Sequence, residues 1–184
     1  LGVAGVATER GRITTDARLR TAVPNIYAAG DCVGPFQFTH FAEAQARVAA
    51  RNALFYGWQN FGAPNVPWVT YCSPELAHVG LTEAAARAAD DDVVVYRYRY
   101  DHLDRAICEG QTAGMAKLVA NKRGVILGCS ILGYAAGEAI ANVVLAMDHG
   151  VNVTALGNSI FAYPTMSRVV RRLSDRKFME AGVN

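Results

Sequence analysis

Apolar and polar residues repeat with two different periods along the chain, and each period predicts one kind of element. Residues 93–100 carry an apolar or aromatic side chain at every second position, with arginines between the last of them, which predicts an antiparallel strand. Residues 136–149 instead repeat apolar side chains every three to four positions and end at Gly150, which predicts a helix. We therefore expect strands with one buried face and helices that can cover that face.

In the second part of the chain most strands follow one another and most helices come after them. Strands grouped in this way, without strict strand–helix alternation, favour an α+β fold with an antiparallel sheet and helices on one face. Such a sheet leaves apolar surface open to a partner, and a symmetric homodimer is the expected outcome. The further strands are expected at 66–71, 114–120 and 125–132, and the further helices at 82–89, where Thr82 is the N-cap, near 154–156 and at 165–179.

The first part of the chain predicts a short strand followed by a long helix. Residues Ile26–Ala29 form an apolar run typical of a buried parallel strand, and Thr39–Tyr56 predicts a helix. Glycine and proline gather in residues 57–66, so we expect the domain boundary there, between 1–62 and 63–184. We interpret a stripe of alanines on the helix as close packing on a sheet (Ala42, Ala46, Ala49, Ala50 and Ala53).

Composition argues against several classes of function. Hydrophobic residues make up 52% of the chain and charged residues 18%, which is typical of a globular protein. The net charge of +2 and the lack of a basic cluster argue against a nucleic-acid partner. The densest basic run, residues 168–177, has helical spacing and favours a solvated face or an interface rim. No apolar run reaches the roughly 20 residues of a membrane helix, so no membrane partner is expected.

The four cysteines lie far apart, at positions 32, 72, 108 and 129. None forms a C-x-x-C pair or a spacing with histidine that suits zinc, so no metal site is expected. We interpret all four as reduced structural thiols of a cytoplasmic protein. The chain begins with Leu1, and residues 1–7 resemble a fragment of a longer segment. Deliberate truncation, proteolysis or a split chain would each account for that start.

The most informative stretch is Thr21–Asp31, in which an apolar run leads into Gly30 and a single carboxylate. Eight residues later, Thr39 stands where it can cap the long helix. A carboxylate beside a helix N-terminus suits a ligand with hydroxyls and an electron-poor ring edge, because the helix start stabilises negative charge. The ribityl chain and pyrimidine edge of a flavin have these properties. The alternative for Asp31 is a turn-forming or helix-capping aspartate.

Residues 21–31 resemble the second flavin-contacting segment of the FAD-dependent pyridine nucleotide-disulfide oxidoreductases, which include dihydrolipoamide dehydrogenase, glutathione reductase and mercuric reductase. Residues 66–83 resemble the opening of that family's C-terminal dimerisation domain. The resemblance implies the C-terminal part of an FAD-binding α/β domain in 1–62 and a dimerisation domain in 63–184. Later landmarks of the family follow in order (Gly114–Val119, Ile126–Gly128, Ala136–Glu138 and Tyr163–Thr165).

The resemblance also implies roles for the residues around Asp31. The Asp31 carboxylate would hold a ribityl hydroxyl, and Gly30 would let the backbone pass close to the cofactor. Phe38 and Thr39 would offer backbone N–H groups to the N1/O2 edge of the flavin, where a helix dipole stabilises the reduced ring. His40 would be a neighbour of the flavin. The alternatives are a surface or packing role for His40 and a plain N-cap for the Thr39 side chain.

The segment Tyr163–Arg168 departs from the family members that reduce disulfides. Those members carry histidine at the position of Tyr163 and glutamate at that of Arg168, and this pair performs acid–base chemistry on thiols. A tyrosine phenol ordinarily has a pKa of about 10, against about 6.5 for imidazole, so it shuttles protons poorly near neutral pH. This argues against disulfide reduction by that mechanism. Tyr163 remains the candidate catalytic residue, with packing at a dimer interface as the alternative, and the Tyr163–Pro164 bond is expected to be cis.

In having tyrosine at this position the chain resembles mercuric reductase, although it does not have the C-terminal cysteine pair of that enzyme. The expected parent protein is a mercuric-reductase-like homodimer that passes electrons from NAD(P)H via FAD to a small acceptor, a metal ion or a disulfide. Because the chain has no G-x-G-x-x-G fingerprint, the dinucleotide-binding segments would lie outside it. The alternative is a non-catalytic homodimerisation module that binds no cofactor by itself, and a metal-handling domain is a remote third hypothesis.

Overall fold

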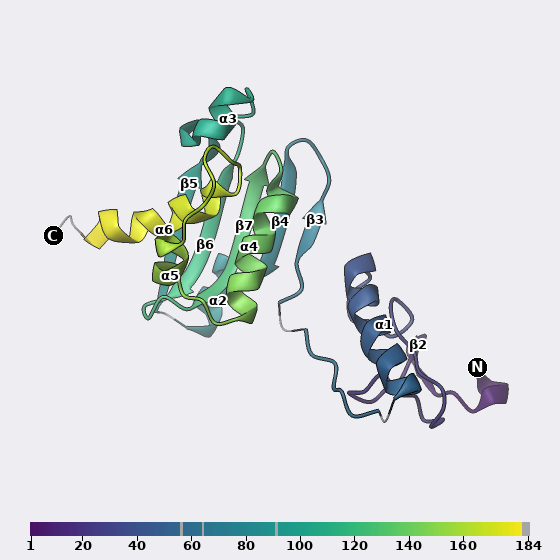
Figure 1. Ribbon diagram of the computed structural model, residues 1–184. Coiled ribbons are helices and arrows are strands. Elements are labelled where there is room, and N and C mark those ends of the chain that lie inside the picture. The colour runs from purple at the N-terminus through teal and green to yellow at the C-terminus, as the bar shows by residue number, and fades with distance from the viewer. Residues whose placement is uncertain (56, 64, 91, 182–184) are drawn as a thin grey trace. The chain divides into compact units, whose positions relative to one another are not determined.

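The computed structural model of the chain describes residues 1–55, 57–63, 65–90 and 92–181, without the side chains of 176–181. These residues form two compact units, Leu1–Ala63 and Pro64–Asn184. In Figure 1 the first unit contains one long helix with short strands, and the second contains a sheet with covering helices. Within the described residues, the helices are too short or too polar to cross a lipid bilayer.

The second unit is built on a five-stranded sheet in which every neighbouring pair of strands is antiparallel. This sheet and its helices confirm the predicted α+β fold. The edge strand β3 is shorter than predicted, because it pairs with β4 alone and its ends have no second partner. In spatial order the strands are β3 (Trp68–Thr70), β4 (Glu75–Gly80), β7 (Ile126–Gly133), β6 (Met115–Asn121) and β5 (Val93–Arg99).

Three helices, α4, α5 and α6, cover one face of this sheet (Figure 1). The predicted helices are confirmed with shifted ends, and the five-residue helix α3 was not predicted, because it is too short to set up a period. The helices of this unit are α2 (Glu83–Ala89), α3 (Asp104–Cys108), α4 (Ala136–Asp148), α5 (Val153–Asn158) and α6 (Arg168–Ala181), with a 3-10 turn η2 (Tyr100–His102).

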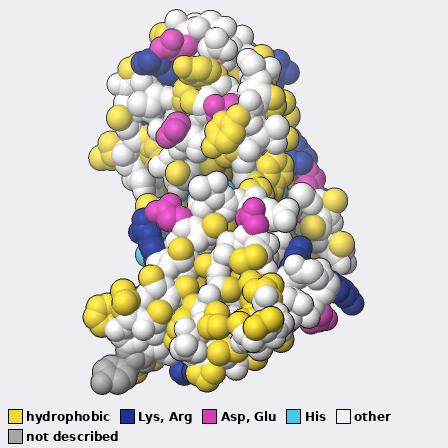
Figure 2. Space-filling model, turned by 90° about the vertical axis from the view of Figure 1, so that its right-hand side faces the viewer, with side chains coloured by type: hydrophobic (Ala, Val, Ile, Leu, Met, Phe, Trp, Pro, Cys, Tyr) yellow, Lys and Arg dark blue, Asp and Glu magenta, His cyan; other side chains and the backbone are white. Residues whose placement is uncertain are grey.

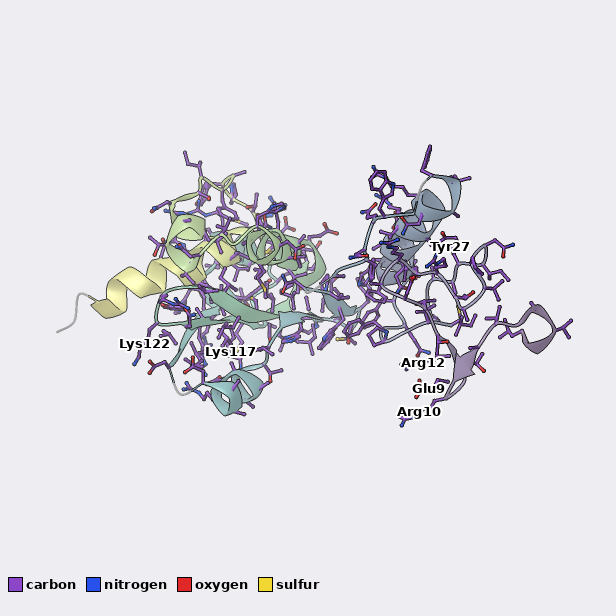
Figure 3. All side chains as sticks on the ribbon, turned by 90° about the horizontal axis from the view of Figure 1, so that it is seen from below. Glu9, Arg10, Arg12, Tyr27, Lys117 and Lys122 are labelled. Carbon is purple, nitrogen blue, oxygen red and sulfur yellow. The ribbon has the colours of Figure 1, made fainter. Side chains whose placement is uncertain are left out.

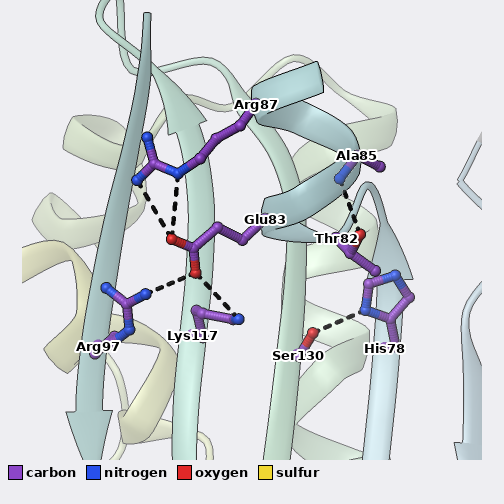
Figure 4. Close-up of polar contacts among 8 residues, drawn as sticks. All are labelled: His78, Thr82, Glu83, Ala85, Arg87, Arg97, Lys117 and Ser130. Atoms are coloured by element: carbon purple, nitrogen blue, oxygen red, sulfur yellow. Dashed lines mark hydrogen bonds and ion pairs between the residues drawn. The ribbon is translucent and has the colours of Figure 1, made fainter. Parts of the chain in front are cut away.

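Alternation along the central strands separates an apolar face of the sheet from a polar one. Ala77, Leu118 and Ile131 are fully buried in the core beneath the helices. The next position along β4, His78, points to the other face, where its Nδ1 atom lies 2.9 Å from the Ser130 hydroxyl of β7 (Figure 4). β4 was not predicted, because its six residues mix apolar side chains with histidine and glycine and do not alternate cleanly.

Two glycines of β7 let other segments lie directly on the sheet. A Cβ at Gly128 would stand 2.2 Å from the Leu81 carbonyl oxygen, and one at Gly133 would stand 2.3 Å from the Tyr100 ring. The Tyr100 ring is fully buried there, and its hydroxyl donates to the Tyr134 carbonyl oxygen at 3.3 Å. Burial raises the pKa of Tyr100 well above its usual value, so the side chain is a neutral part of the core.

The first turn of α2 is held by a cap and by an ion cluster, both visible in Figure 4. The Thr82 hydroxyl accepts a hydrogen bond from the Ala85 N–H at 3.2 Å, which confirms the predicted N-cap. The Glu83 carboxylate lies among three cations of α2, β5 and β6. Burial alone would raise the pKa of Glu83, but hydrogen bonds from these cations hold it below its usual value. The distances to Glu83 are 3.3 Å from Arg87, 2.6 Å from Arg97 and 3.2 Å from Lys117.

The first unit has little regular structure besides its long helix. The predicted strand Ile26–Ala29 is wrong. Tyr27 makes only an isolated antiparallel bridge with Arg20, because none of the strands among the described residues pairs with this segment. The Tyr27 hydroxyl instead donates to the Asn52 carbonyl oxygen of the helix at 3.2 Å. The elements are a 3-10 turn η1 (Gly2–Ala4), the two-residue strands β1 (Thr8–Glu9) and β2 (Arg12–Ile13), and α1 (Thr39–Leu54).

α1 begins where predicted, but it buries a different face. Its predicted last residue, Tyr56, lies outside the described residues. Of the predicted alanine stripe, Ala49 is buried and Ala42 has intermediate exposure, whereas Ala46, Ala50 and Ala53 are exposed. A methyl group removes little apolar area from water, so the face with larger side chains is the buried one. That face consists of Phe41, Gln45, Val48, Ala49 and Asn52.

We expect Glu83→Gln to lower the free energy of unfolding by about 1 kcal/mol near pH 7. Because the pKa of Glu83 is lowered in the folded state, its stabilisation is present above the ordinary carboxyl pKa and is lost as the pH falls through the lowered value. Urea titrations of both proteins should therefore show a difference that shrinks as the pH falls below the ordinary carboxyl pKa.

The control is Glu109→Gln, which removes a more exposed pair with Arg105. The side chain of Glu109 is 40% exposed and that of Glu83 is 22% exposed, so the control should change the stability less. Equal losses in the two variants, or a Glu83→Gln effect that persists in acid, would contradict this account of the cluster.

Candidate functional site

The Asp31 loop, residues 30–34, leads from the Tyr27 bridge towards α1. It is a closed turn, because the N–H groups of Val33 and Gly34 donate to the Gly30 carbonyl oxygen at 2.9 and 3.1 Å. Gly30 has a φ of +83°, a left-handed conformation that other residues rarely adopt. A Cβ at Gly30 would stand 3.2 Å from the Ala42 Cβ atom, so the loop lies directly against α1.

A buried glutamine of α1 binds both ends of the Asp31 loop. Gln45 is 2% exposed, and its Oε1 atom accepts a hydrogen bond from the Gly30 N–H at 2.7 Å. Its Nε2 atom donates to the Gly34 carbonyl oxygen at 3.3 Å. The middle of the loop is held from the other side, where the Ile13 N–H of β2 donates to the Cys32 carbonyl oxygen at 2.7 Å.

These contacts leave the Asp31 side chain exposed at the surface. Among the residues that the structure describes, its carboxylate accepts no hydrogen bond and forms no ion pair. The alternative that Asp31 caps the helix is wrong, because Phe38 occupies the N-cap position. The carboxylate is therefore oriented by the backbone around it and is free to accept hydrogen bonds from a ligand.

α1 begins without a side-chain cap. Phe38 is the N-cap, with extended dihedrals, and Thr39 is already the first helical residue. The predicted role of the Thr39 hydroxyl as N-cap is therefore wrong. An N-cap side chain belongs to the residue just before the first helical one and accepts from an N–H group two or three residues later, and Thr39 is not at that position. The Phe38 side chain makes no capping hydrogen bond, so the positive end of the helix dipole has no capping side chain from the N-cap residue.

Aromatic side chains surround this helix start. Phe38 stacks on Phe36 and on His40, with ring centroids 6.0 and 5.3 Å apart. Phe41 meets Phe36 and Phe61 edge-on at 5.3 and 5.4 Å. Sequence reasoning missed Phe36, Phe41 and Phe61, although the close spacing of phenylalanines from position 36 to position 41 was a usable signal. The cluster fixes the path of the chain into α1.

This arrangement fits the ribityl chain and pyrimidine edge of a flavin. The Asp31 carboxylate suits hydroxyl groups, and the uncapped start of α1 suits a ring edge that becomes negative. The close contact of Gly30 with Ala42 leaves little room for a side chain there and brings the backbone of the loop against α1. Five of the six predicted site residues, Gly30, Asp31, Phe38, Thr39 and His40, lie within this loop–helix junction.

The sixth residue, Tyr163, lies in the second unit, on the loop between α5 and α6. The Tyr163–Pro164 bond is cis, as predicted. The Thr165 hydroxyl donates to the Ala162 carbonyl oxygen at 2.8 Å and closes the loop. The Arg168 guanidinium lies over the Tyr163 ring, 5.0 Å from its centroid, which is the geometry of a cation–π contact. Tyr163 is 66% exposed, so its hydroxyl is accessible.

The described residues hold no cluster of three or more histidine, cysteine or carboxylate side chains that could bind a metal ion. All four cysteines are free thiols. Cys129 is buried in the core, and burial raises its pKa to about 12, which suppresses the reactive thiolate form. Cys32, Cys72 and Cys108 are exposed.

Two family models match the chain. The model of the pyridine nucleotide-disulphide oxidoreductase dimerisation domain matches residues 66–174, and a second model, of pyridine nucleotide-disulphide oxidoreductases, matches residues 1–48. The chain is 38% identical over 172 residues to a dihydrolipoyl dehydrogenase of Chlorobaculum tepidum, and 36% identical over 168 residues to a mercuric reductase of Shewanella putrefaciens. These alignments cover 93% and 90% of the chain but 37% and 30% of the relatives, so the chain spans about a third of their length.

The chain also matches solved structures of flavoprotein reductases and related proteins over most of its length. The Cu(II) complex of the HOCl-induced flavoprotein disulfide reductase RclA from Escherichia coli matches with a TM-score of 0.87 at 32% identity. That match covers 94% of this chain and 40% of the RclA chain. LpdA from Mycobacterium tuberculosis matches with a TM-score of 0.85 at 26% identity, and this match covers 94% of this chain and 38% of LpdA.

Proposed function

The chain belongs to the pyridine nucleotide-disulphide oxidoreductase family, and on that basis we propose that it is the C-terminal part of a flavin-dependent NAD(P)H oxidoreductase. The whole protein would pass electrons from NAD(P)H via FAD to a small acceptor. The observation that carries the proposal is the exposed Asp31 carboxylate beside the uncapped start of α1. The order of the two matches, residues 1–48 and then 66–174, supports the same assignment.

In this proposal the first unit contributes one side of an FAD site. Bound FAD would supply the capacity to accept a hydride and pass electrons on. Asp31 would bind a ribityl hydroxyl, and the backbone N–H groups at Phe38 and Thr39 would meet the N1/O2 edge of the ring. His40, stacked on Phe38 at 5.3 Å, would lie beside the flavin. The helix dipole would favour the ring edge when it carries negative charge.

A further part of the FAD domain would cover the exposed apolar surface of the first unit. Figure 2 shows hydrophobic side chains on the face of this unit, in the lower part of the view. Phe55 and Trp58 are 69% and 76% exposed and line a cavity of about 730 Å³ at the far end of α1. Apolar surface of this kind is unusual on an isolated domain and supports a missing neighbour.

The second unit would serve as the dimerisation domain. Leu145 of α4 and Ile160, 62% and 101% exposed, line a cavity of about 610 Å³ beside the Tyr163 loop. A homodimer would bury this surface, because two copies can present the same patch to each other. Each chain would then lend Tyr163 to the flavin site of its partner, where the phenol would contact the acceptor.

The acceptor would be a metal ion or a disulfide, as in a mercuric-reductase-like enzyme. One curated relative is named a mercuric reductase and a matched structure is titled a flavoprotein disulfide reductase in complex with Cu(II). Tyr163 and its Arg168 neighbour have neither an imidazole nor a carboxylate, so these two side chains would not perform thiol exchange as a histidine–glutamate pair does. The competing proposal is a non-catalytic homodimerisation module that binds no cofactor by itself.

We expect Asp31→Ala to raise the dissociation constant for FAD in the full-length protein about 10- to 100-fold. A hydrogen bond to a charged group contributes about 1.5–3 kcal/mol, and about 1.4 kcal/mol is tenfold in binding. Flavin fluorescence on reconstitution of the apoprotein measures this change. Glu9→Ala is the control, because Glu9 lies at the end of β1, away from α1 (Figure 3). Unchanged FAD affinity in Asp31→Ala would refute this flavin site and leave the dimerisation module.

Tyr163→Phe should slow electron transfer to the acceptor at least about tenfold, because it removes the only hydroxyl of that side chain while keeping the ring on Arg168. Stopped-flow bleaching of the flavin band by NAD(P)H should be unchanged, since that step does not involve Tyr163. Tyr134→Phe, at a second exposed tyrosine of the same unit, is the control. Equal turnover in wild type and Tyr163→Phe would leave Tyr163 with a packing role only.

Ile160→Glu should raise the dimer dissociation constant at least about 100-fold, because a dimer would bury an unpaired charge at the patch. Analytical ultracentrifugation of this chain measures the change directly. Val125→Glu changes an apolar side chain of the β6–β7 turn that is 47% exposed and does not line this cavity, so it should leave the dimer intact. A wild-type chain that is monomeric at high concentration would exclude this interface.

A further inference from the structure

The side chain that joins the two halves of the candidate flavin site is Gln45. Its amide uses both of its functions on one loop: Oε1 accepts from the Gly30 N–H at 2.7 Å, and Nε2 donates to the Gly34 carbonyl oxygen at 3.3 Å. Asp31 is the residue that follows Gly30. A single side chain therefore spans the turn that carries the candidate ribityl-binding carboxylate.

Gln45 stands in the second turn of α1, whose first turn contains Thr39 and His40. The loop and the helix start are separate in sequence, and the amide ties one to the other. The same contact brings Gly30 against Ala42, one turn before Gln45, where a Cβ would stand 3.2 Å from the Ala42 Cβ atom. The position of Asp31 relative to the helix N-terminus thus depends on this contact.

The amide is the side chain that this position requires. Gln45 is 2% exposed, and a buried polar group is costly unless each function finds a partner. The Gly30 N–H needs an acceptor and the Gly34 carbonyl oxygen needs a donor, and an amide of this length offers one of each. Methionine has a similar shape but offers neither function at normal strength, and ionised glutamate would offer only acceptors.

We propose that Gln45 is a positioning residue for flavin binding, which holds the Asp31 carboxylate at a fixed place relative to the N-terminus of α1. The inference rests on the proposed FAD site. Gln45 does not contact the flavin in this account; it acts through the backbone of Gly30 and Gly34. A ribityl chain bound to Asp31 and a ring edge bound at the helix start would both require the spacing that Gln45 sets.

The first test uses the chain itself, without any cofactor. Gln45→Met should speed amide hydrogen exchange at Gly30 at least about tenfold, measured by NMR, because the N–H loses its buried acceptor. Exchange at Val143, in the core of the second unit, should stay unchanged. Gln37→Met is the matched control, because Gln37 is an exposed glutamine of the neighbouring segment. Unchanged exchange at Gly30 in Gln45→Met would overturn the proposal.

The second test uses the full-length protein and a double-mutant cycle with Asp31→Ala, read as the dissociation constant for FAD. We expect Gln45→Met alone to weaken binding about tenfold, and to have no further effect once Asp31 is alanine. A purely structural role would instead weaken binding by the same factor in both backgrounds, and that result would overturn the proposal.

These measurements separate the proposal from the function on which it rests. If Asp31→Ala itself leaves FAD affinity unchanged, the flavin site is refuted, whatever Gln45 does to exchange. If Asp31→Ala weakens binding but Gln45→Met does not, the flavin site stands and the positioning role of Gln45 is refuted. Should Gln45→Met fail to fold, the wild-type chain still decides: the Gly30 amide must exchange at least about tenfold more slowly than the Asp31 amide, and equal rates would overturn the proposal.

Discussion

The second unit depends on the pleat of its central strands, which sends alternate side chains to opposite faces. Ala77, Leu118 and Ile131 all point to the helices and are fully buried, so α4 and α6 meet a continuous apolar surface. A shift of one residue in register would turn His78 and Lys117 into that core, and unpaired polar groups there cost several kcal/mol. The contacts that these two residues make on the other face, with Ser130 and Glu83, are compatible with one register only.

Most of this unit could be predicted from the sequence, because alternation and helical periodicity are local signals. β5 and α4 are long enough to show their periods, and the Thr82 cap depends on residues within one turn. β4 could not be predicted in this way, because its strand character comes from pairing with β3 and β7. At Ile26–Ala29 a strand was predicted that does not form. The apolar run has the composition of a strand, but its only strand-like pairing is one isolated bridge.

The candidate site shows the same limit at the scale of single residues. Asp31 could be predicted, since a lone carboxylate between an apolar run and a helix is visible in the sequence. Gln45 could not, because hydrogen bonds to a loop 11 and 15 residues away leave no periodic trace. The start of α1 was placed correctly, yet the cap was assigned to Thr39, because N-cap and first helical residue differ by one position and only the backbone dihedrals distinguish them.

The neutrality of Gln45 also sets the electrostatics of the loop. Asp31 carries the only carboxylate of residues 30–34, and it is exposed to solvent that screens it. A carboxylate at position 45 would add a buried negative charge beneath the same loop, close to the N-terminus of α1, where weak screening makes it count most. It would oppose the stabilisation that the helix dipole gives to negative charge on a ligand. An amide can therefore fix the geometry of the site without weakening the positive field of the helix N-terminus. A glutamate of the same length would weaken that field.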